Sequence, residues 1–155
     1  MADIVIYGGT FNPIHNGHMA VCRYVWGELG APKILLIPTA APPHKEAPAL
    51  APGEDRLAMC RLAAAELSGA EVLDWELLRG GYTIETLRYL SERYSGDRLF
   101  LLMGSDMFLT FREWRDWRGI GELVTLLVVS READDAKPLI AQQGSLAADG
   151  IISQI

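Results

Sequence analysis

Hydrophobic residues form short continuous runs that alternate with stretches in which they recur every three or four positions. Such runs are typical of buried strands, and the recurring spacing is typical of helices with one inward face. Helices are expected from His18 to Leu29, from Asp55 to Leu67 and from Thr83 to Tyr94. Strands are expected at residues 3–7, 33–37, 71–75, 99–103 and 124–129. This alternation predicts an α/β fold, an open parallel sheet with helices on both faces.

Four loops that follow expected strands carry unusual residues. They are GGTFNPIHNGH, PTAAPPHK, GSDMFL and SR, in chain order. Because ligands bind at the carboxyl ends of parallel strands, we expect all four at one edge of the sheet. The second lies in Pro38 to Pro52, which holds five of the eight prolines and is expected to be a long loop. Ser105 to Trp117 is expected to be an irregular, aromatic-rich helical segment.

Composition predicts one soluble globular domain over residues 1–155. Half of the residues are hydrophobic and 22% are charged, with a net charge of −6. An acidic chain is a poor candidate for broad nucleic-acid binding, although a local cationic pocket stays possible. No apolar run is long enough to span a bilayer and no signal peptide is evident, so we expect a cytoplasmic protein without membrane contact. Cys22 and Cys60 lie among apolar residues and are expected to be reduced core thiols.

The segment Gly8 to His18 is the strongest chemical signal. Gly8 and Gly9 let the backbone approach a ligand closely. His18 falls at an expected helix start, where the helix dipole favours anions, and His15 lies three residues before it. The pattern predicts a phosphate-binding cradle. A plain glycine turn is the alternative, and two histidines also suit a metal, although no Cys, His or Asp cluster supplies the remaining ligands.

This segment resembles the signature of the HxGH nucleotidyltransferases, which include pyridine-nucleotide, phosphopantetheine and cytidylyl transferases. Further segments resemble the bacterial nicotinate-mononucleotide adenylyltransferases, and the likeness runs in order from residue 4 to about residue 131. They are PTAAPPHK, GYTIETL, GSDMFLTFREWRDW and VVSR. The resemblance implies a Rossmann-like nucleotidyltransferase fold. It also implies transfer of the adenylyl group of ATP to nicotinate mononucleotide, giving deamido-NAD and pyrophosphate in NAD biosynthesis.

The resemblance assigns three residues to catalysis. His15 and His18 would contact the ATP phosphates and stabilise the charge that develops on transfer, and Lys45 would add a cation. Without the resemblance, Lys45 is interpreted as a solvated surface lysine. Asp106 would orient the adenosine side, although a helix cap is compatible with its position. The implied ATP-binding residues are Gly8, Gly9, Thr10, Phe11, Gly17, Gly104, Asp106 and Arg131.

A second set is implied for the pyridine nucleotide. It consists of Thr39, Tyr82, Thr83 and Trp114. Thr83 would hydrogen-bond near the ring substituent, and it is also a plausible helix N-cap. Trp114 would stack on the pyridine ring. A core position is the alternative, because Trp114 and Trp117 are at helical spacing.

The expected mechanism is direct in-line displacement with no covalent intermediate, because no nucleophile is paired with a base. Mg²⁺ would be carried by the ATP phosphates, with no metal site in the protein. The partners are then ATP and nicotinate mononucleotide, and a homo-oligomer is possible. Phosphopantetheine adenylyltransferase and a non-catalytic nucleotide-binding relative are the alternatives.

The chain departs from the family pattern at two places. Asn12 replaces an aspartate that many relatives carry, and both residues favour turns. The family's late I-S-S-T-x-x-R motif is not found in this chain. In the final GIISQI, Ile152 and Ser153 resemble its beginning, but no Ser-Thr pair or arginine follows them. Either the chain is truncated or it has lost part of its phosphate site. We therefore expect it to fold and bind the pyridine nucleotide but to handle ATP poorly, because in the family that motif holds the phosphates.

Overall fold

The computed structural model describes residues 2–11, 13–28, 30, 33–39, 51–130 and 136–155. The chain divides into two compact units, residues 2–81 and residues 82–155. Lys45 and Arg131, together with Asn12 and most of the expected proline-rich loop, lie outside the described residues.

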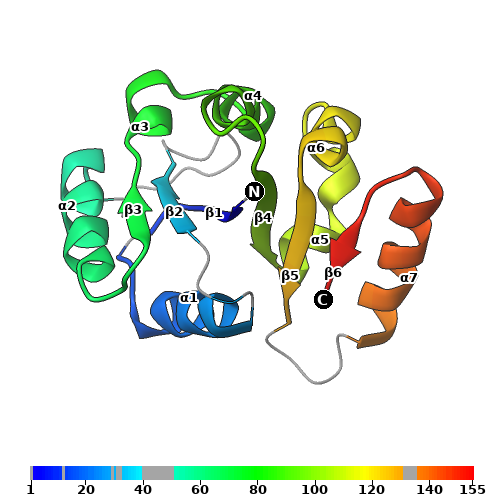
Figure 1. The fold of residues 1–155 in the computed structure, drawn as a ribbon, viewed down its shortest axis with the longest axis horizontal. Coiled ribbons are helices and arrows are strands. Elements are labelled where there is room, and N and C mark those ends of the chain that lie inside the picture. Colours follow the sequence, from blue (N-terminus) through cyan, green and yellow to red (C-terminus); the bar gives the residue numbers. More distant parts are fainter. Residues whose placement is uncertain (1, 12, 29, 31–32, 40–50, 131–135) are drawn as a thin grey trace. The chain divides into compact units, whose positions relative to one another are not determined.

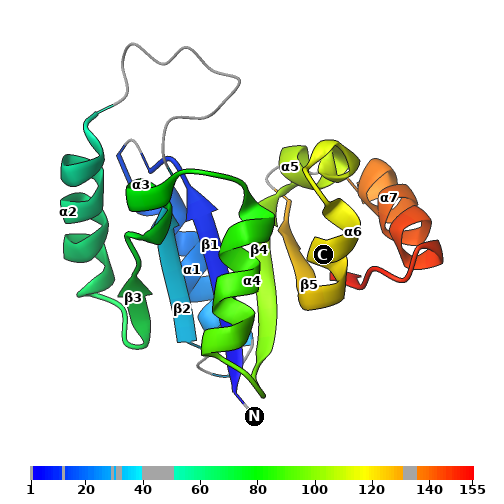
Figure 2. The same ribbon diagram turned by 90° about the horizontal axis from the view of Figure 1, so that it is seen from above.

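The first unit holds three parallel strands in the order β3-β2-β1. They are β1 (Asp3–Gly9), β2 (Lys33–Pro38) and β3 (Ala70–Val72). Helix α1 (Asn16–Glu28) and the short α3 (Trp75–Arg79) lie on opposite faces of these strands (Figure 1). Helix α2 (Gly53–Ala64) packs along β2 and β3 (Figure 2).

Strands β1 and β2 of this unit are largely buried. Ile34, Leu35, Leu36 and Ile37 of β2 have no exposed surface, and β1 is buried from Ile4 to Tyr7. Such continuous apolar runs are the sequence mark of a covered parallel strand. Cys22 and Cys60 are free and fully buried, as predicted. Burial raises the pKa of each thiol to about 11, so both stay protonated at neutral pH.

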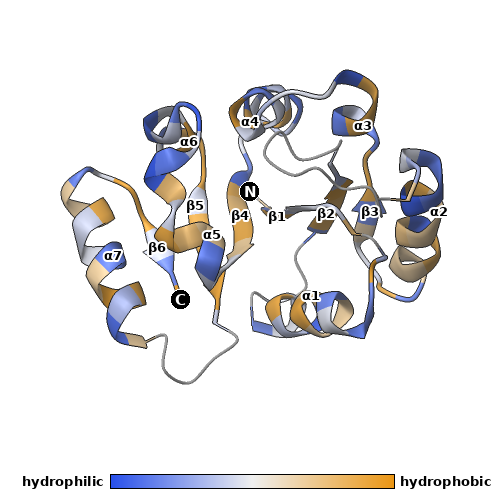
Figure 3. Cartoon of the chain, turned by 180° about the vertical axis from the view of Figure 1, so that it is seen from behind, coloured by the Kyte–Doolittle hydropathy of each residue, from blue (hydrophilic) through white to orange (hydrophobic). Residues whose placement is uncertain are grey.

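The second unit also holds parallel strands, in the order β4-β5-β6. The strands are β4 (Arg98–Gly104), β5 (Thr125–Val129) and β6 (Ser153–Gln154). Helices α4 (Thr83–Arg93) and α6 (Trp117–Leu123) pack side by side, and α5 (Ser105–Leu109) packs against α7 (Ala136–Ala148) (Figure 1). Most of β4 is hydrophobic, and its residues Leu99 to Met103 are buried, whereas the helices of this unit carry both hydrophobic and hydrophilic residues (Figure 3).

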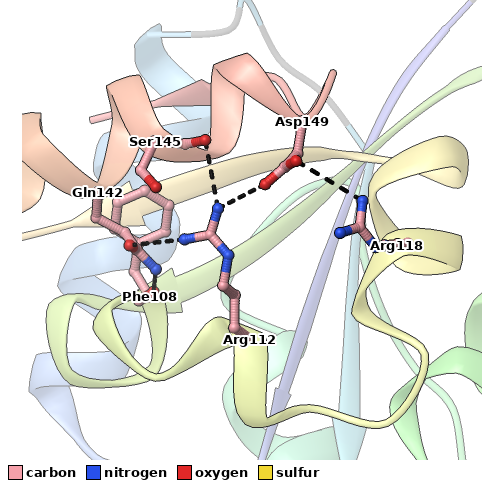
Figure 4. Close-up of polar contacts among 6 residues, drawn as sticks. All are labelled: Phe108, Arg112, Arg118, Gln142, Ser145 and Asp149. Atoms are coloured by element: carbon pink, nitrogen blue, oxygen red, sulfur yellow. Dashed lines mark hydrogen bonds and ion pairs between the residues drawn. The ribbon is translucent and has the colours of Figure 1, made fainter.

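Arg112 ties the middle of the second unit to α7. It lies in the 3₁₀ turn η1 (Phe111–Glu113) and donates to the Asp149 carboxylate at 2.6 Å and to the Ser145 carbonyl at 3.3 Å (Figure 4). Arg118 of α6 lies 3.7 Å from the same carboxylate. The Arg112 hydrogen bond, aided by the charge of Arg118, lowers the pKa of Asp149 below its usual range.

Some local expectations are wrong for identifiable reasons. The strand expected at 71–75 ends at Val72, because the chain turns at Asp74 into α3. Thr83 is the first residue of α4 rather than its N-cap, since Tyr82 holds that place and donates its N–H to the Glu85 carboxylate at 3.4 Å.

Trp114 and Trp117 share no helix, although their spacing suggests one. Asp116 adopts a left-handed conformation (φ 49°) and accepts the Gly119 N–H, which starts α6 anew. Helix α7 and strand β6 were not expected. The buried residues of α7 are only Leu139 and Leu146, too few for a clear helical period.

Candidate functional site

His15 and His18 form a stacked pair at the start of α1. Their ring centroids lie 3.9 Å apart with an interplanar angle of 27°. His18 sits in the first turn of α1, as the motif predicts, and His15 directly precedes the helix. His15 is exposed and His18 half-buried, so the pair lies at the surface of the first unit. The amino end of α1 therefore presents two imidazoles at the positive end of the helix dipole, an arrangement that suits an anion.

The backbone orients both imidazole rings. The N–H of Gly17 donates to His15 Nδ1 at 3.0 Å, and the N–H of His15 donates to His18 Nδ1 at 3.1 Å. A ring nitrogen that accepts a hydrogen bond carries no proton, so each neutral ring bears its proton on Nε2. Both histidines are thus held as Nε2–H donors, the form needed to hydrogen-bond a phosphate oxygen.

Phe11 holds this segment in place by packing its buried ring against its neighbours. It is 1% exposed, and its ring meets Tyr7 edge-on at 5.4 Å and His18 at 5.1 Å. Its φ of 47° lies in the left-handed region, which costs an ordinary residue of order 1 kcal/mol or more. Burial of the aromatic ring offsets that strain. Phe11 therefore supports the His18 ring through packing, besides the backbone role expected for it.

The glycines expected at the site differ in how much space a side chain would find there. A Cβ on Gly17 would stand 2.8 Å from His15 Cε1, so only glycine leaves that ring its place. A Cβ on Gly9 would press on the Phe11 ring at 3.3 Å. Gly8 meets only the Ile37 carbonyl at 3.8 Å, and Gly104 meets nothing within 4 Å. The protein itself leaves room at Gly8 and Gly104, which is compatible with close approach of a ligand.

The ends of β1 and β2 lie together, as expected for neighbouring parallel strands. Gly9 is opposite Pro38 in the register, and the Thr39 N–H donates to the Gly9 carbonyl at 2.9 Å. Thr10 and Thr39 are half-buried beside this junction. Arg56 of α2 donates to the carbonyls of both threonines. Sequence reasoning missed Arg56, because a charged residue beside Glu54 and Asp55 looks like part of a solvated helix face.

In the second unit, Gly104 ends β4 and Asp106 lies in the first turn of α5 with its side chain exposed. Gly104 pairs with Val129, so the segments after β4 and β5 begin at the same edge of this unit. Gly104, not Asp106, is the N-cap of α5.

The residues expected at the pyridine nucleotide also lie in the second unit. Tyr82 and Thr83 start α4, with Tyr82 42% exposed and Thr83 half-buried. Trp114 is half-buried, with its ring 5.5 Å from Phe111. The guanidinium of Arg115 lies 4.6 Å from the Tyr82 ring centroid. The partial exposure of Tyr82, Thr83 and Trp114 leaves each of them accessible to a ligand.

The described residues contain neither a metal-binding cluster nor a helix that could cross a membrane. No group of three or more His, Cys, Asp or Glu side chains in this part of the chain could hold a metal ion. None of the described helices has the length and apolarity that crossing a membrane requires.

The chain is similar in sequence to one protein family and to several proteins that share a name. Residues 6–149 match the model of the Cytidylyltransferase-like family. The chain is 40% identical over 130 residues to a protein of Aquifex aeolicus (strain VF5) named "Probable nicotinate-nucleotide adenylyltransferase", covering 83% of this chain and 77% of that protein. It is likewise 40% identical over 138 residues to the Geobacter sulfurreducens protein of the same name, covering 88% and 64%.

Solved structures show the same fold. The nicotinic acid mononucleotide adenylyltransferase of Plasmodium falciparum, complexed with NaAD, matches with a TM-score of 0.76 at 18% identity, over 92% of this chain and 71% of that one. Its complex with APC gives a TM-score of 0.72 over the same shares. The predicted Rossmann-like α/β fold with a parallel sheet is thereby confirmed.

Proposed function

We propose that this chain transfers the adenylyl group of ATP to nicotinate mononucleotide. It belongs to the Cytidylyltransferase-like family and, within that family, to the nicotinate-nucleotide adenylyltransferases. The products are deamido-NAD (NaAD) and pyrophosphate, in a step of NAD biosynthesis. The single observation that carries the chemistry is the stacked His15–His18 pair, held in the Nε2–H form at the amino end of α1.

The reaction is an in-line displacement at the α-phosphorus of ATP. The 5′-phosphate of nicotinate mononucleotide is already ionised, so it attacks without a general base, and pyrophosphate leaves. Catalysis then consists of positioning and of stabilising charge on the phosphoryl oxygens. His15 and His18 supply two donors for this purpose, and α1 adds the positive end of its dipole. Lys45 and Arg131 are proposed as further cations.

The remaining ATP contacts are assigned to the backbone near the strand ends. Gly8, Gly9, Thr10 and Phe11 would line the nucleotide, with Gly17 preserving the geometry of His15. Only the Ile37 carbonyl lies within 4 Å of a Cβ placed on Gly8, which supports close approach of the ligand. Gly104 and Asp106, at the end of β4, would receive the adenosine side, which the exposure of the Asp106 carboxylate permits.

The acceptor is assigned to the residues at the start of α4. The first amides of a helix have no partner within it and favour a negative charge, so the amides that follow Tyr82 at the start of α4 suit the nicotinate carboxylate better than a neutral amide. The half-buried Trp114 would stack on the pyridine ring. Thr39, whose N–H donates to the Gly9 carbonyl, is proposed as a further contact of this ligand.

Mg²⁺ is proposed to enter with ATP. The described residues offer no cluster of metal ligands, and Mg²⁺ commonly binds through substrate phosphates with several waters retained. When bound, the ion would neutralise charge on the phosphates. We further propose that residues 1–155 act as one nucleotidyltransferase domain, because the family match spans residues 6–149. A cytoplasmic location is proposed, since ATP is abundant in that compartment.

An acceptor panel tests the proposal. The purified chain is supplied with Mg²⁺, ATP and either nicotinate mononucleotide, nicotinamide mononucleotide or 4′-phosphopantetheine, and pyrophosphate release is followed. We expect the highest kcat/KM with nicotinate mononucleotide and no release with phosphopantetheine. Release with phosphopantetheine alone would assign the chain to the other acceptor class. Binding of the pyridine nucleotide with no release for any acceptor would favour a non-catalytic relative.

A further inference from the structure

Arg56 is a buried cation that donates hydrogen bonds to three backbone carbonyls. It lies in the first turns of α2 and is 3% exposed. Its Nε donates to the Ala51 carbonyl at 3.0 Å, and its Nη1 donates to the carbonyls of Thr10 at 2.9 Å and Thr39 at 2.6 Å. Among the described residues, no carboxylate forms an ion pair with it.

These three carbonyls belong to segments far apart in the sequence. Thr10 follows the glycine pair at the end of β1, 46 residues from Arg56, and Thr39 follows β2, 17 residues away. Ala51 lies two residues before the start of α2. The Thr39 N–H also bonds to the Gly9 carbonyl, so the segments after β1 and β2 are joined twice. One guanidinium thus fixes the distance between two strand-end segments.

A buried guanidinium with no carboxylate partner among the described residues is costly to desolvate, and it contributes stability only if its hydrogen bonds are well made. Cores are ordinarily filled by apolar residues that avoid this cost. The carbonyls that Arg56 holds are those of Thr10, in the segment with His15 and His18, and of Thr39. The location of these contacts favours a role in the site over a purely stabilising one.

We propose that Arg56 is a positioning residue for the phosphate site, holding the segments after β1 and β2 at the separation that ATP binding requires. This rests on the proposed function, in which Thr10, His15 and His18 meet ATP. A guanidinium is needed because its planar fork reaches carbonyls in several directions at once, whereas an ammonium on a flexible stem does not hold the same geometry. The charge of Arg56 also adds to the positive potential around the bound phosphates.

The proposal predicts a selective defect. In Arg56→Met the segment with Thr10 relaxes away from Thr39, so ATP binding should weaken at least 10-fold. Nicotinate mononucleotide affinity should fall by less than 3-fold, because Arg56 is bonded to only one residue assigned to that ligand, Thr39, and the ring is assigned to Thr83 and Trp114. Exchange of the Thr39 amide hydrogen, which bonds to Gly9, should accelerate at least 10-fold. Arg56→Lys should keep part of the ATP affinity.

The matched control is Arg61→Met, which removes an exposed arginine from the same helix. The affinity for each ligand is measured by calorimetry, and the exchange rate of the Thr39 amide hydrogen is measured as well. Both variants are studied well below their melting temperatures. Millimolar guanidinium added to Arg56→Ala should recover part of its ATP affinity. If Arg56→Met does not fold, Arg56→Lys and the rescue of Arg56→Ala decide the matter.

Unchanged ATP affinity in Arg56→Met would overturn the positioning role, and so would an equal loss of affinity for both ligands. Full ATP affinity in Arg56→Lys, together with no recovery of Arg56→Ala by guanidinium, would also overturn it. These readouts are binding and exchange, so they do not depend on turnover. A wild-type chain that binds ATP but transfers nothing would contradict the proposed function while leaving the test of Arg56 intact.

Discussion

Gly17→Ala should separate catalytic geometry from stability. The new Cβ would stand 2.8 Å from His15 Cε1 and 3.0 Å from His15 Nδ1. To regain an ordinary separation of about 3.5 Å, the imidazole must retreat by about 0.7 Å. The Gly17 N–H to Nδ1 hydrogen bond would be strained or lost, and the 3.9 Å stack on His18 would be disturbed.

The expected loss is in rate rather than in folding. Displacement of a reacting group by about 1 Å can lower the rate roughly 10²-fold, so kcat should fall by roughly 10- to 100-fold. Alanine favours a helix over glycine by up to about 1 kcal/mol, which offsets much of the steric strain. The melting temperature should therefore change by only a few degrees.

Gly27→Ala provides the matched control in the same helix, because a Cβ there meets nothing within 4 Å. Steady-state pyrophosphate release gives kcat, and thermal unfolding gives stability. The control should retain the wild-type kcat. If Gly17→Ala also turns over at nearly the wild-type rate, then either the His15 ring is not held as described or its position does not matter to catalysis.

Three further predictions concern other parts of the molecule. His18→Ala should abolish most pyrophosphate release, by roughly 10²–10³-fold, with the fold intact by circular dichroism, and near-normal release would remove His18 from the mechanism. Nicotinate should be preferred over nicotinamide mononucleotide, because amides at the start of α4 near Thr83 favour a carboxylate; equal kcat/KM values would refute that reason. The pKa of Asp149 is lower in the folded protein than in the unfolded chain. Its carboxylate therefore stabilises the fold at pH values above the unfolded pKa, and this stabilisation is lost as the pH falls through the folded pKa. Asp149→Asn should thus narrow the stability difference between pH 7 and pH 3, and an unchanged difference would show that the Arg112 contact contributes little.

The strands and the phosphate motif could be predicted because their signals are local. β2 is a continuous apolar run buried on both faces, and a glycine beside two histidines before an apolar helical pattern places His18 in the first turn of α1. Gly17 could be assigned to the motif, but its steric reason could not, since it depends on where the His15 ring lies.

Long-range contacts account for what the sequence did not reveal. Arg56 is bonded to carbonyls up to 46 residues away, and no local pattern distinguishes it from exposed arginines such as Arg61. The left-handed conformation of Phe11 follows from burial of its ring, not from its intrinsic preference. At Trp117, helical spacing was misleading because the Asp116 cap begins a separate helix.

The most direct test of adenylyl transfer follows the label of ATP. The chain is incubated with nicotinate mononucleotide, Mg²⁺ and ATP labelled either at the α-phosphorus or at the γ-phosphorus, and the products are separated. We predict α-label in NaAD and γ-label in pyrophosphate, in equal amounts. Label from the γ-phosphorus in the pyridine product, or no labelled NaAD at all, would contradict the account.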